Sequence, residues 1–446
     1  MNASNPPAGM LMRLGATLGL AQLAPLATSL ALAATVARLG QAPFSAFMLV
    51  ATINTTLFVA AAALLQALFI VGGRALGRDD ADGYAAARAA ASRLTLACAV
   101  ACAAASLATG PALARLGVDH RLAADAGRIG IAAAWGVPAG LAMALLRIRA
   151  ALAGDAARIS LIYVAGGVTT FSLGLAAQHA TGNAVAVACA VSAGAWLQLV
   201  TAMAIVGRGP QSHLPRPTPA AVAGAVRQLW GFGWPVALVV FLDSFALSAS
   251  SVIVARFWPG EVAAHSTALL AVTAGLVLPL GVAQATLQLI AVASGRGEPG
   301  DAARLARAAV RLAAGFGAAV AAACAGAAAL VPAGPVATLL VPAAALLAAQ
   351  AVIVVAASAL RSAGLVRAPL GYALVGYVGL AVGGALLFGP GLGLGLPGVW
   401  LGLVLGFGVT AAAVTRRALC HYPDPDAPTG AATTVFSHPT QQRGVS

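Results

Sequence analysis

Asp243 is the acidic residue that lies deepest inside an apolar stretch of this sequence. It follows the first 11 residues of the apolar run Phe232–Val254, so a helix would place it roughly 16 Å from the start of that run. The other acidic residues lie in loops, at the ends of apolar runs or near the C-terminus. A carboxylate at this depth of a bilayer costs several kcal/mol unless it is protonated, paired or hydrated. We expect Asp243 to exchange protons; the alternative is a neutral carboxyl that is hydrogen-bonded between helices.

Uncharged polar side chains also occur inside the apolar runs. Each can line a hydrated cavity or bond to a neighbouring helix, and such a helix–helix bond contributes about 0.6 kcal/mol on average. Ser250 shares the helical stripe of Asp243 with Pro235 and Ser251. His265 is expected at the membrane interface. We take four of these side chains as candidates for a substrate cavity: Gln22, Asn54, Gln284 and Ser250.

The sequence argues against an enzyme and against a metal protein. No other acid, His or Arg accompanies Asp243 deep in an apolar run, so a second catalytic group is missing, and there is no GxxxxGK[ST] motif to bind ATP. Cys98 and Cys102 share a helical face, but no His or carboxylate joins them as further ligands. We therefore expect no catalytic activity, no metal and no cofactor.

The composition predicts that lipid is the main solvent of this chain. Hydrophobic residues make up 61% of the 446 residues and charged residues only 8%, whereas soluble domains carry about 25% charged residues. Twelve apolar runs are long enough to cross a bilayer as helices, and they are too long and too continuous for barrel strands. The runs are Leu14–Ala37, Phe44–Val71, Leu94–Ala112, Ile129–Leu146, Ile159–Ala177, Ala184–Val206, Phe232–Val254, Thr267–Ala291, Leu312–Leu330, Val336–Leu360, Leu370–Phe388 and Leu396–Val414. We predict an all-α membrane protein with twelve transmembrane helices.

The basic residues, all of them Arg, predict the orientation of these helices. With a cytoplasmic N-terminus, 20 of the 25 Arg residues fall on the cytoplasmic side, and only Arg38, Arg115, Arg121, Arg128 and Arg256 fall on the other. The positive-inside rule therefore predicts that both termini lie on the cytoplasmic side of the membrane, which we take to be a bacterial inner membrane. The Arg residues stand singly or in pairs between apolar runs, so the net charge of +13 does not indicate nucleic-acid binding. No cleavable signal peptide is expected.

An internal repeat divides the chain into two halves. A shift of 218 positions places Val36–Arg38 on Val254–Arg256, Gly77–Arg78 on Gly295–Arg296, and Arg93–Leu94 on Arg311–Leu312. Six helices per half give both halves the same orientation, so a pseudo-twofold axis along the membrane normal should relate them, as in the parallel repeats of secondary transporters. We predict a six-helix lobe over 1–207, a Pro-rich cytoplasmic linker over 208–228, a second six-helix lobe over 229–417 and a disordered tail over 418–446.

Several motifs, in order and on matching helices, resemble the multidrug and toxic compound extrusion (MATE) family over nearly all of residues 14 to 417. The motifs are Val36-Ala37-Arg38-Leu39-Gly40, Ala263-Ala264-His265, Pro279-Leu280-Gly281-Val282-Ala283-Gln284-Ala285, Ala359-Leu360-Arg361-Ser362-Ala363-Gly364 with Arg367 and Pro369, and Gly398-Val399-Trp400-Leu401-Gly402.

The resemblance implies a function and a set of coupling residues. MATE transporters have two six-helix lobes, a cleft that opens to each side in turn, and efflux driven by inward H⁺ or Na⁺. Asp243 matches an acidic position of the family's seventh helix, whereas Leu32 and Gln350 stand where many members have Asp. The resemblance therefore implies cation coupling at Asp243 and Gln350. A single remaining carboxylate favours H⁺ over Na⁺, because a dehydrated metal cation needs several oxygen ligands.

We therefore predict a monomeric antiporter that exports small cationic or neutral amphipathic compounds, with H⁺ or Na⁺, the substrate and membrane lipid as its partners. One alternative is a flippase of lipid-linked saccharides from the same superfamily. That function expects a strongly cationic central cavity, and no Arg lies in the middle of an apolar run. The other alternative is an uncoupled accessory membrane protein, suggested by the missing carboxylates at Leu32 and Gln350.

Overall fold

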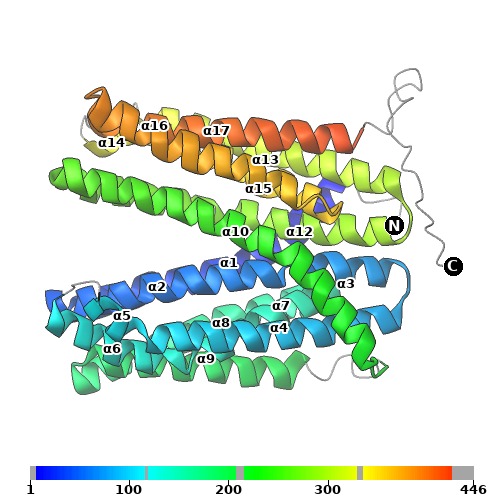
Figure 1. Cartoon of the computed structure of the whole chain (residues 1–446), viewed down its shortest axis with the longest axis horizontal. Helices are drawn as coiled ribbons and strands as arrows, with labels where there is room; N and C mark the ends of the chain where they lie inside the picture. The colour runs from blue at the N-terminus through cyan, green and yellow to red at the C-terminus, as the bar shows by residue number, and fades with distance from the viewer. Residues whose placement is uncertain (1–6, 116–118, 207–214, 329–334, 424–446) are drawn as a thin grey trace.

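A computed structural model describes residues 7–115, 119–206, 215–328 and 335–423 of the protein. These residues form helices that lie in two bundles side by side (Figure 1). The first bundle contains α1 (Pro7–Ala37), α2 (Gln41–Leu65), α3 (Ala67–Gly77), α4 (Ala81–Leu107), α5 (Thr109–Arg115), α6 (His120–Ala134), α7 (Val137–Leu152), α8 (Ala156–Thr181) and α9 (Ala184–Val206).

The second bundle follows in the same order along the chain. It contains α10 (Pro219–Phe257), η2 (Pro259–Glu261), α11 (Val262–Gly275), α12 (Val277–Gly295), α13 (Pro299–Ala328), α14 (Pro335–Ser362), α15 (Arg367–Ala373), η3 (Leu374–Val382), α16 (Gly383–Leu386), η4 (Leu387–Gly391) and α17 (Gly395–His421).

The number of membrane-spanning helices agrees with the twelve apolar runs. Eleven helical segments of the described chain are long and apolar enough to cross a membrane, and the pair α6–α7, bent by 45°, makes the twelfth when it is counted as one span. The repeat is visible in the helix ends: α3 ends at Gly77 and α12 at Gly295, and α4 begins at Ala81 and α13 at Pro299. The predicted all-α, two-lobe architecture is confirmed.

Three helices, α4, α10 and α13, begin well before their apolar runs. Asp80 caps α4 by accepting a hydrogen bond from the Gly83 amide at 2.7 Å, and Thr218 caps α10, whose first residue is Pro219. Amphipathic turns with Arg on the exposed side then precede the apolar part of each helix. The predicted linker is consequently too long, because its residues 219–228 are helical.

The predicted tail begins too early as well. Helix α17 continues through residues 418–421, and Tyr422 packs into the core with 7% of its surface exposed. Residues 424–446 of the predicted tail and residues 208–214 of the predicted linker lie outside the described part of the chain.

Several spans are broken, and the sequence supplies a cause at two of the breaks. The bend between α6 and α7 lies at Trp135–Gly136, directly before Pro138 in the first turn of α7, and α12 starts after a turn at Leu276 with Pro279 in its first turn. Proline is tolerated in a first helical turn, where its missing N–H has no intrahelical partner.

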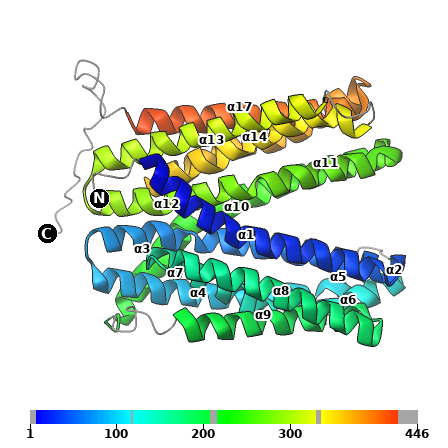
Figure 2. The ribbon, with the colours of Figure 1, turned by 180° about the vertical axis from the view of Figure 1, so that it is seen from behind.

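The first helix of each bundle crosses to the other bundle. In Figure 1 the start of α10 lies against the first bundle and its end lies in the second, and in Figure 2 the start of α1 lies against α12 and α13 before the helix joins the first bundle. Leu11 of α1 and Val222 of α10 accordingly share one buried cluster with residues of both bundles. The boundary in space therefore differs from the boundary in sequence.

The two bundles are packed together at one end, which we call the Arg-rich end because Arg74, Arg149, Arg296 and Arg361 lie there, near the ends of α3, α7, α12 and α14. A side chain on Gly77 would place Cβ 2.3 Å from the carbonyl oxygen of Val292 and 2.9 Å from Cα of Gly295. The backbones of the two bundles therefore meet there without intervening side chains.

Toward the opposite end the bundles have separate cores. One buried cluster holds Val36 and Ala46 of the first bundle, and another holds Val254 and Trp400 of the second. The helices of the two bundles diverge in that direction (Figure 1). The structure is therefore closed at the Arg-rich end.

Candidate functional site

Asp243 lies in the second half of α10, and its carboxylate has a direct partner. The Gln350 amide on α14 donates a hydrogen bond through Nε2 to Asp243 Oδ1 at 3.2 Å. Gln350 is buried with 3% of its surface exposed, and its Oε1 has no hydrogen-bond partner among the described residues. The structure thus brings together the two residues that the resemblance assigned to cation coupling.

Tyr377 completes this neighbourhood and was missed by the sequence analysis. It lies on η3 with 2% of its surface exposed, stacks on Phe407 with ring centroids 4.4 Å apart, and is near enough to Asp243 for the two groups to interact electrostatically. The available signal was a tyrosine in the middle of the apolar run Leu370–Phe388, where Tyr372 lies near the start and Tyr377 lies deeper. Asp243, Gln350 and Tyr377 come from three helices of one bundle, and we call them the Asp243 cluster.

The Asp243 cluster offers few ligands for a metal ion. It contains one carboxylate, one free amide oxygen and one phenol oxygen, and no group of three or more His, Cys, Asp or Glu side chains able to hold a metal occurs in the described chain. A hard cation such as Ca²⁺ takes six to eight oxygen ligands, whereas a proton needs one acceptor. The donor set is therefore suited to protonation and deprotonation of a carboxylate.

Two turns further along α10, Ser250 and Ser251 surround a buried histidine. His265 Nε2 lies 3.3 Å from Ser250 Oγ and 3.2 Å from Ser251 Oγ, and its ring meets Trp400 edge-on with centroids 5.6 Å apart. His265 is fully buried and its Nδ1 has no partner in the described chain. His265 is thus enclosed within the second bundle by α10 and Trp400 of α17.

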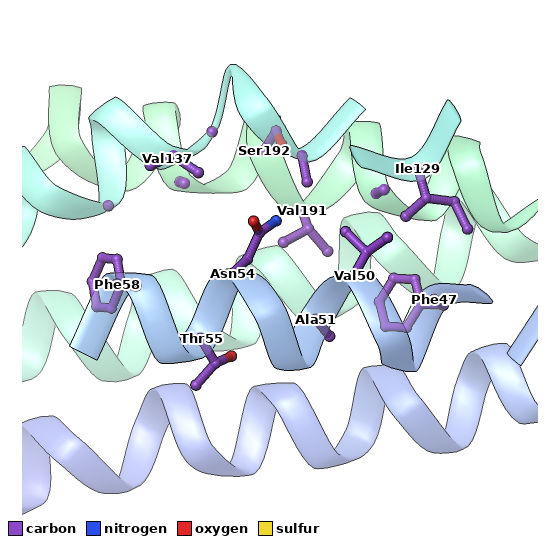
Figure 3. A pocket seen from close by; sticks show the side chains of 15 residues that line it. Phe47, Val50, Ala51, Asn54, Thr55, Phe58, Ile129, Val137, Val191 and Ser192 are labelled. Atoms are coloured by element: carbon purple, nitrogen blue, oxygen red, sulfur yellow. The ribbon is translucent and has the colours of Figure 1, made fainter. Parts of the chain in front are cut away.

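Asn54 lines a cavity of about 260 Å³ in the first bundle, between α2, α6, α7 and α9. Figure 3 shows it between Phe47 and Phe58, with Ser192 on the facing helix. Asn54 Nδ2 donates to Ser106 Oγ at 3.1 Å, and Asn54 Oδ1 has no partner among the described residues. The lining carries no charged side chain, so the cavity suits an uncharged or weakly polar group.

The remaining substrate-cavity candidates lie apart from this cavity. Gln22 is half-buried on α1. Gln284 on α12 is buried with 4% of its surface exposed, and its Oε1 has no partner in the described chain. Ser250 is 1% exposed and donates to the Leu247 carbonyl at 2.7 Å. Leu32, at the position of a family carboxylate, is packed in the apolar core of the first bundle.

Polar contacts at the Arg-rich end join the two bundles. Arg74 of α3 donates to the Ser362 carbonyl at the end of α14 at 2.6 Å, and its guanidinium lies 5.8 Å from the centroid of the Phe232 ring on α10. Gln288 of α12 donates to the Ala151 carbonyl of α7 at 2.8 Å. These bonds hold the Arg-rich end closed.

Tyr422 supports the same region from the end of the described chain. Its hydroxyl donates to the Ala359 carbonyl at 3.1 Å, and its own carbonyl accepts from Arg307 Nε at 3.0 Å. Burial raises the pKa of the Tyr422 hydroxyl, so the group stays protonated and able to donate. The last residues of α17 thereby brace the end of α14 that Arg74 contacts.

Known proteins resemble this chain in sequence and in fold. No protein-family model matches it. The "Probable multidrug resistance protein NorM" of Brucella suis biovar 1 is 32% identical over 217 residues, which cover 44% of this chain and 45% of that protein. A protein of the same name from Deinococcus radiodurans is 34% identical over 79 residues, 18% of each chain. The matched segments thus span less than half the length of these relatives.

Solved structures match over the whole described fold. The eukaryotic MATE transporter AtDTX14 superposes with a TM-score of 0.81 at 15% identity, over 93% of this chain and 98% of that chain. An outward-facing MATE transporter of the MOP superfamily superposes with a TM-score of 0.83 at 20% identity, over 94% and 96%. The two-lobe fold and the NorM relatives together confirm the resemblance to the MATE family that the sequence motifs indicated.

Proposed function

We propose that the protein is a secondary active exporter of small organic compounds and that inward proton flow through Asp243 drives it. The observation that carries the proposal is the pairing of Asp243 with Gln350 in the membrane core of the second bundle. A carboxylate with one amide donor retains lone pairs that accept a proton. The NorM relatives, named as multidrug resistance proteins, support the efflux part of the proposal.

The choice of H⁺ over Na⁺ rests on the number of ligands. Gln350 stands where many MATE members have a second carboxylate, so the site has lost one anionic ligand. A bound metal cation would have to be held by one carboxylate, one amide oxygen, the Tyr377 phenol oxygen and water. Protonation makes no such demand, and it removes the charge that is costly at this depth.

Protonation of Asp243 changes the packing of α10 against α14. An ionised Asp243 accepts the Gln350 amide bond, whereas a neutral carboxyl is also a donor and can bond to the free Gln350 Oε1. In this proposal the proton enters from the side opposite the Arg-rich end and leaves on the Arg-rich side after the bundles have rearranged.

The substrate class follows from the Asn54 cavity and the lone carboxylate. The cavity walls are apolar and aromatic with Asn54, Thr55 and Ser192 as polar groups, which suits neutral or singly cationic amphipathic compounds. A flippase of lipid-linked saccharides would need basic side chains for a pyrophosphate, and the Asn54 cavity has none. A drug-susceptibility panel in an efflux-deficient host should show raised resistance to amphipathic cations and neutral compounds.

The test of coupling is Asp243→Asn in everted membrane vesicles. We expect substrate transport driven by a pH gradient to fall to the level of vesicles without the protein. Asp125→Asn is the matched control, because Asp125 is an exposed acid paired with Arg128 and its loss should leave transport unchanged. Undiminished transport by Asp243→Asn would refute the coupling role, and absence of transport by the purified wild-type protein would favour an uncoupled accessory protein.

A further inference from the structure

A groove on the outside of the protein, separate from the Asp243 cluster and the Asn54 cavity, has the chemistry of a lipid site. It has a volume of about 520 Å³ and runs between α1 of the first bundle and α12 and α13 of the second. Its walls are apolar, with Met12 and Leu278 exposed by 42% and 37%. Its one charged side chain is Arg311. We call it the α1/α13 groove.

Arg311 stands at the boundary between the polar and the apolar part of α13. The apolar run of this helix begins at Leu312, so Arg311 lies where lipid headgroups are expected, at the Arg-rich end. The groove continues along α13 to Ala319, eight residues further and therefore about 12 Å deeper. A cationic group at the mouth of an apolar channel matches a phosphate followed by an acyl chain.

The charge on Arg311 is available to a ligand. Its side chain is exposed and makes no ion pair or hydrogen bond with the described residues. The nearest acid on the same helix, Asp301, is paired with Arg304, and Arg307 bonds to the Tyr422 carbonyl. Arg311 therefore leaves a net positive charge at the mouth of the groove.

The residues of the groove differ in size from those at the pseudosymmetric positions. Gly315 on its wall has no heavy atom within 4 Å of the position a Cβ would take, so the space beside it is open. The positions 218 residues away carry larger side chains: Ala97 corresponds to Gly315, Val226 to Ala8, and Trp230 to Met12. Arg93, the counterpart of Arg311, thus has the same charge beside larger neighbouring residue types.

We propose that the α1/α13 groove binds one anionic phospholipid of the leaflet at the Arg-rich end, with its phosphate on Arg311 and an acyl chain along Gly315 toward Ala319. The α1 residues of the groove, Ala8 and Met12, lie at the start of that helix, where it packs against α12 and α13, so this lipid contacts the crossing part of α1 and the second bundle. Binding of this lipid does not require transport, so a negative lipid-binding result would leave the proposed export function untouched.

Native mass spectrometry of the delipidated protein tests the site. Phosphatidylglycerol and phosphatidylcholine with identical acyl chains are titrated into the full chain in mild detergent. We expect one tightly bound phosphatidylglycerol, preferred over phosphatidylcholine by about fivefold, the effect of one basic side chain near an anionic headgroup. Equal binding of both lipids to the wild-type protein would overturn the proposal.

Three variants locate the lipid. Arg311→Gln should lose the fivefold preference and still bind phosphatidylcholine, whereas Gly315→Phe fills the open space and should weaken binding of both lipids. Arg93→Gln is the matched control and should behave as the wild type. A preference that survives in Arg311→Gln, or that is lost equally in Arg93→Gln, would assign the lipid to a general surface layer. Thermal unfolding of each variant verifies that Gly315→Phe is folded; if it is not, Gly315→Leu replaces it.

Discussion

At the scale of single residues, the difference between Gln350 and a carboxylate should decide which cation the protein uses. Gln350→Glu would place a second carboxylate beside Asp243, since the present side chains are 3.2 Å apart. Two carboxylates provide the anionic oxygen ligands that a sodium ion lacks in the wild type. We predict that a Na⁺ gradient drives substrate efflux in this variant and not in the wild-type protein, measured in proteoliposomes at constant pH.

The control for this prediction is Asn54→Asp. It also introduces a carboxylate into the membrane core, but in the other bundle and away from Asp243. An equal response of this variant to Na⁺ would show that any added charge suffices, and no response of Gln350→Glu would mean that the Asp243 cluster does not select the cation.

His265 gives a second prediction at this scale. The His265 side chain is fully buried and contacts Ser250, Ser251 and Trp400, which is the environment of a structural residue. His265→Ala removes two polar contacts, each contributing about 0.5–1.5 kcal/mol, and leaves a void. We expect a lower thermal unfolding temperature by several degrees and an unchanged pH profile of efflux, with the exposed His179→Ala as the control. A shifted pH profile would instead make His265 part of the proton path.

At the scale of elements, the contact between α1 and α12 depends on glycine more than on helix propensity. A Cβ on Gly281 would lie 2.0 Å from the carbonyl oxygen of Gly15, so Gly281→Ala should force the helices apart. Alanine stabilises a helix by about 1 kcal/mol relative to glycine, and Gly231→Ala, where nothing lies within 4 Å, should show that gain. We predict opposite signs for the two substitutions in thermal unfolding; a stabilised Gly281→Ala would contradict the close packing.

The sequence predicted the elements better than their relations. Apolar runs located the spans because lipid demands long apolar helices, and the depth of Asp243 followed from counting residues. The sequence analysis did not predict the early starts of α4, α10 and α13. The first turns of these helices are amphipathic and contain Arg, so their hydropathy is as low as that of loops. His265 is buried beside Trp400, which is distant in sequence. The family resemblance assigned Gln350 and Asp243 to cation coupling, but neither it nor the residue spacing predicted their hydrogen bond.

At the scale of the whole molecule, closure at the Arg-rich end should depend on Arg74. Its hydrogen bond to the Ser362 carbonyl crosses between the bundles, and a hydrogen bond from a charged group contributes about 1.5–3 kcal/mol. We predict that Arg74→Gln raises the population open at this end by about tenfold or more. Distances between spin labels at Leu96 and Ala314, both exposed and 218 residues apart, would report it.

Arg78→Gln serves as the control, because Arg78 is exposed one turn away and makes no hydrogen bond or ion pair to the other bundle within the described chain. A distance distribution that shifts equally in both variants would reflect a general loss of positive charge, and one that shifts in neither would place the closing contacts elsewhere, such as at Gln288 and Ala151.

The crossing of α1 and α10 has a mechanical consequence. Each helix is anchored in both bundles, so the two helices link the bundles in addition to the packing and hydrogen bonds at the Arg-rich end. Any separation at the Arg-rich end must bend these helices or detach their first turns from the opposite bundle. Pro25 in α1 and Pro235 in α10 each remove a backbone hydrogen bond and so lower the cost of bending. The stiffness of two helices thereby sets how far the halves can turn relative to each other.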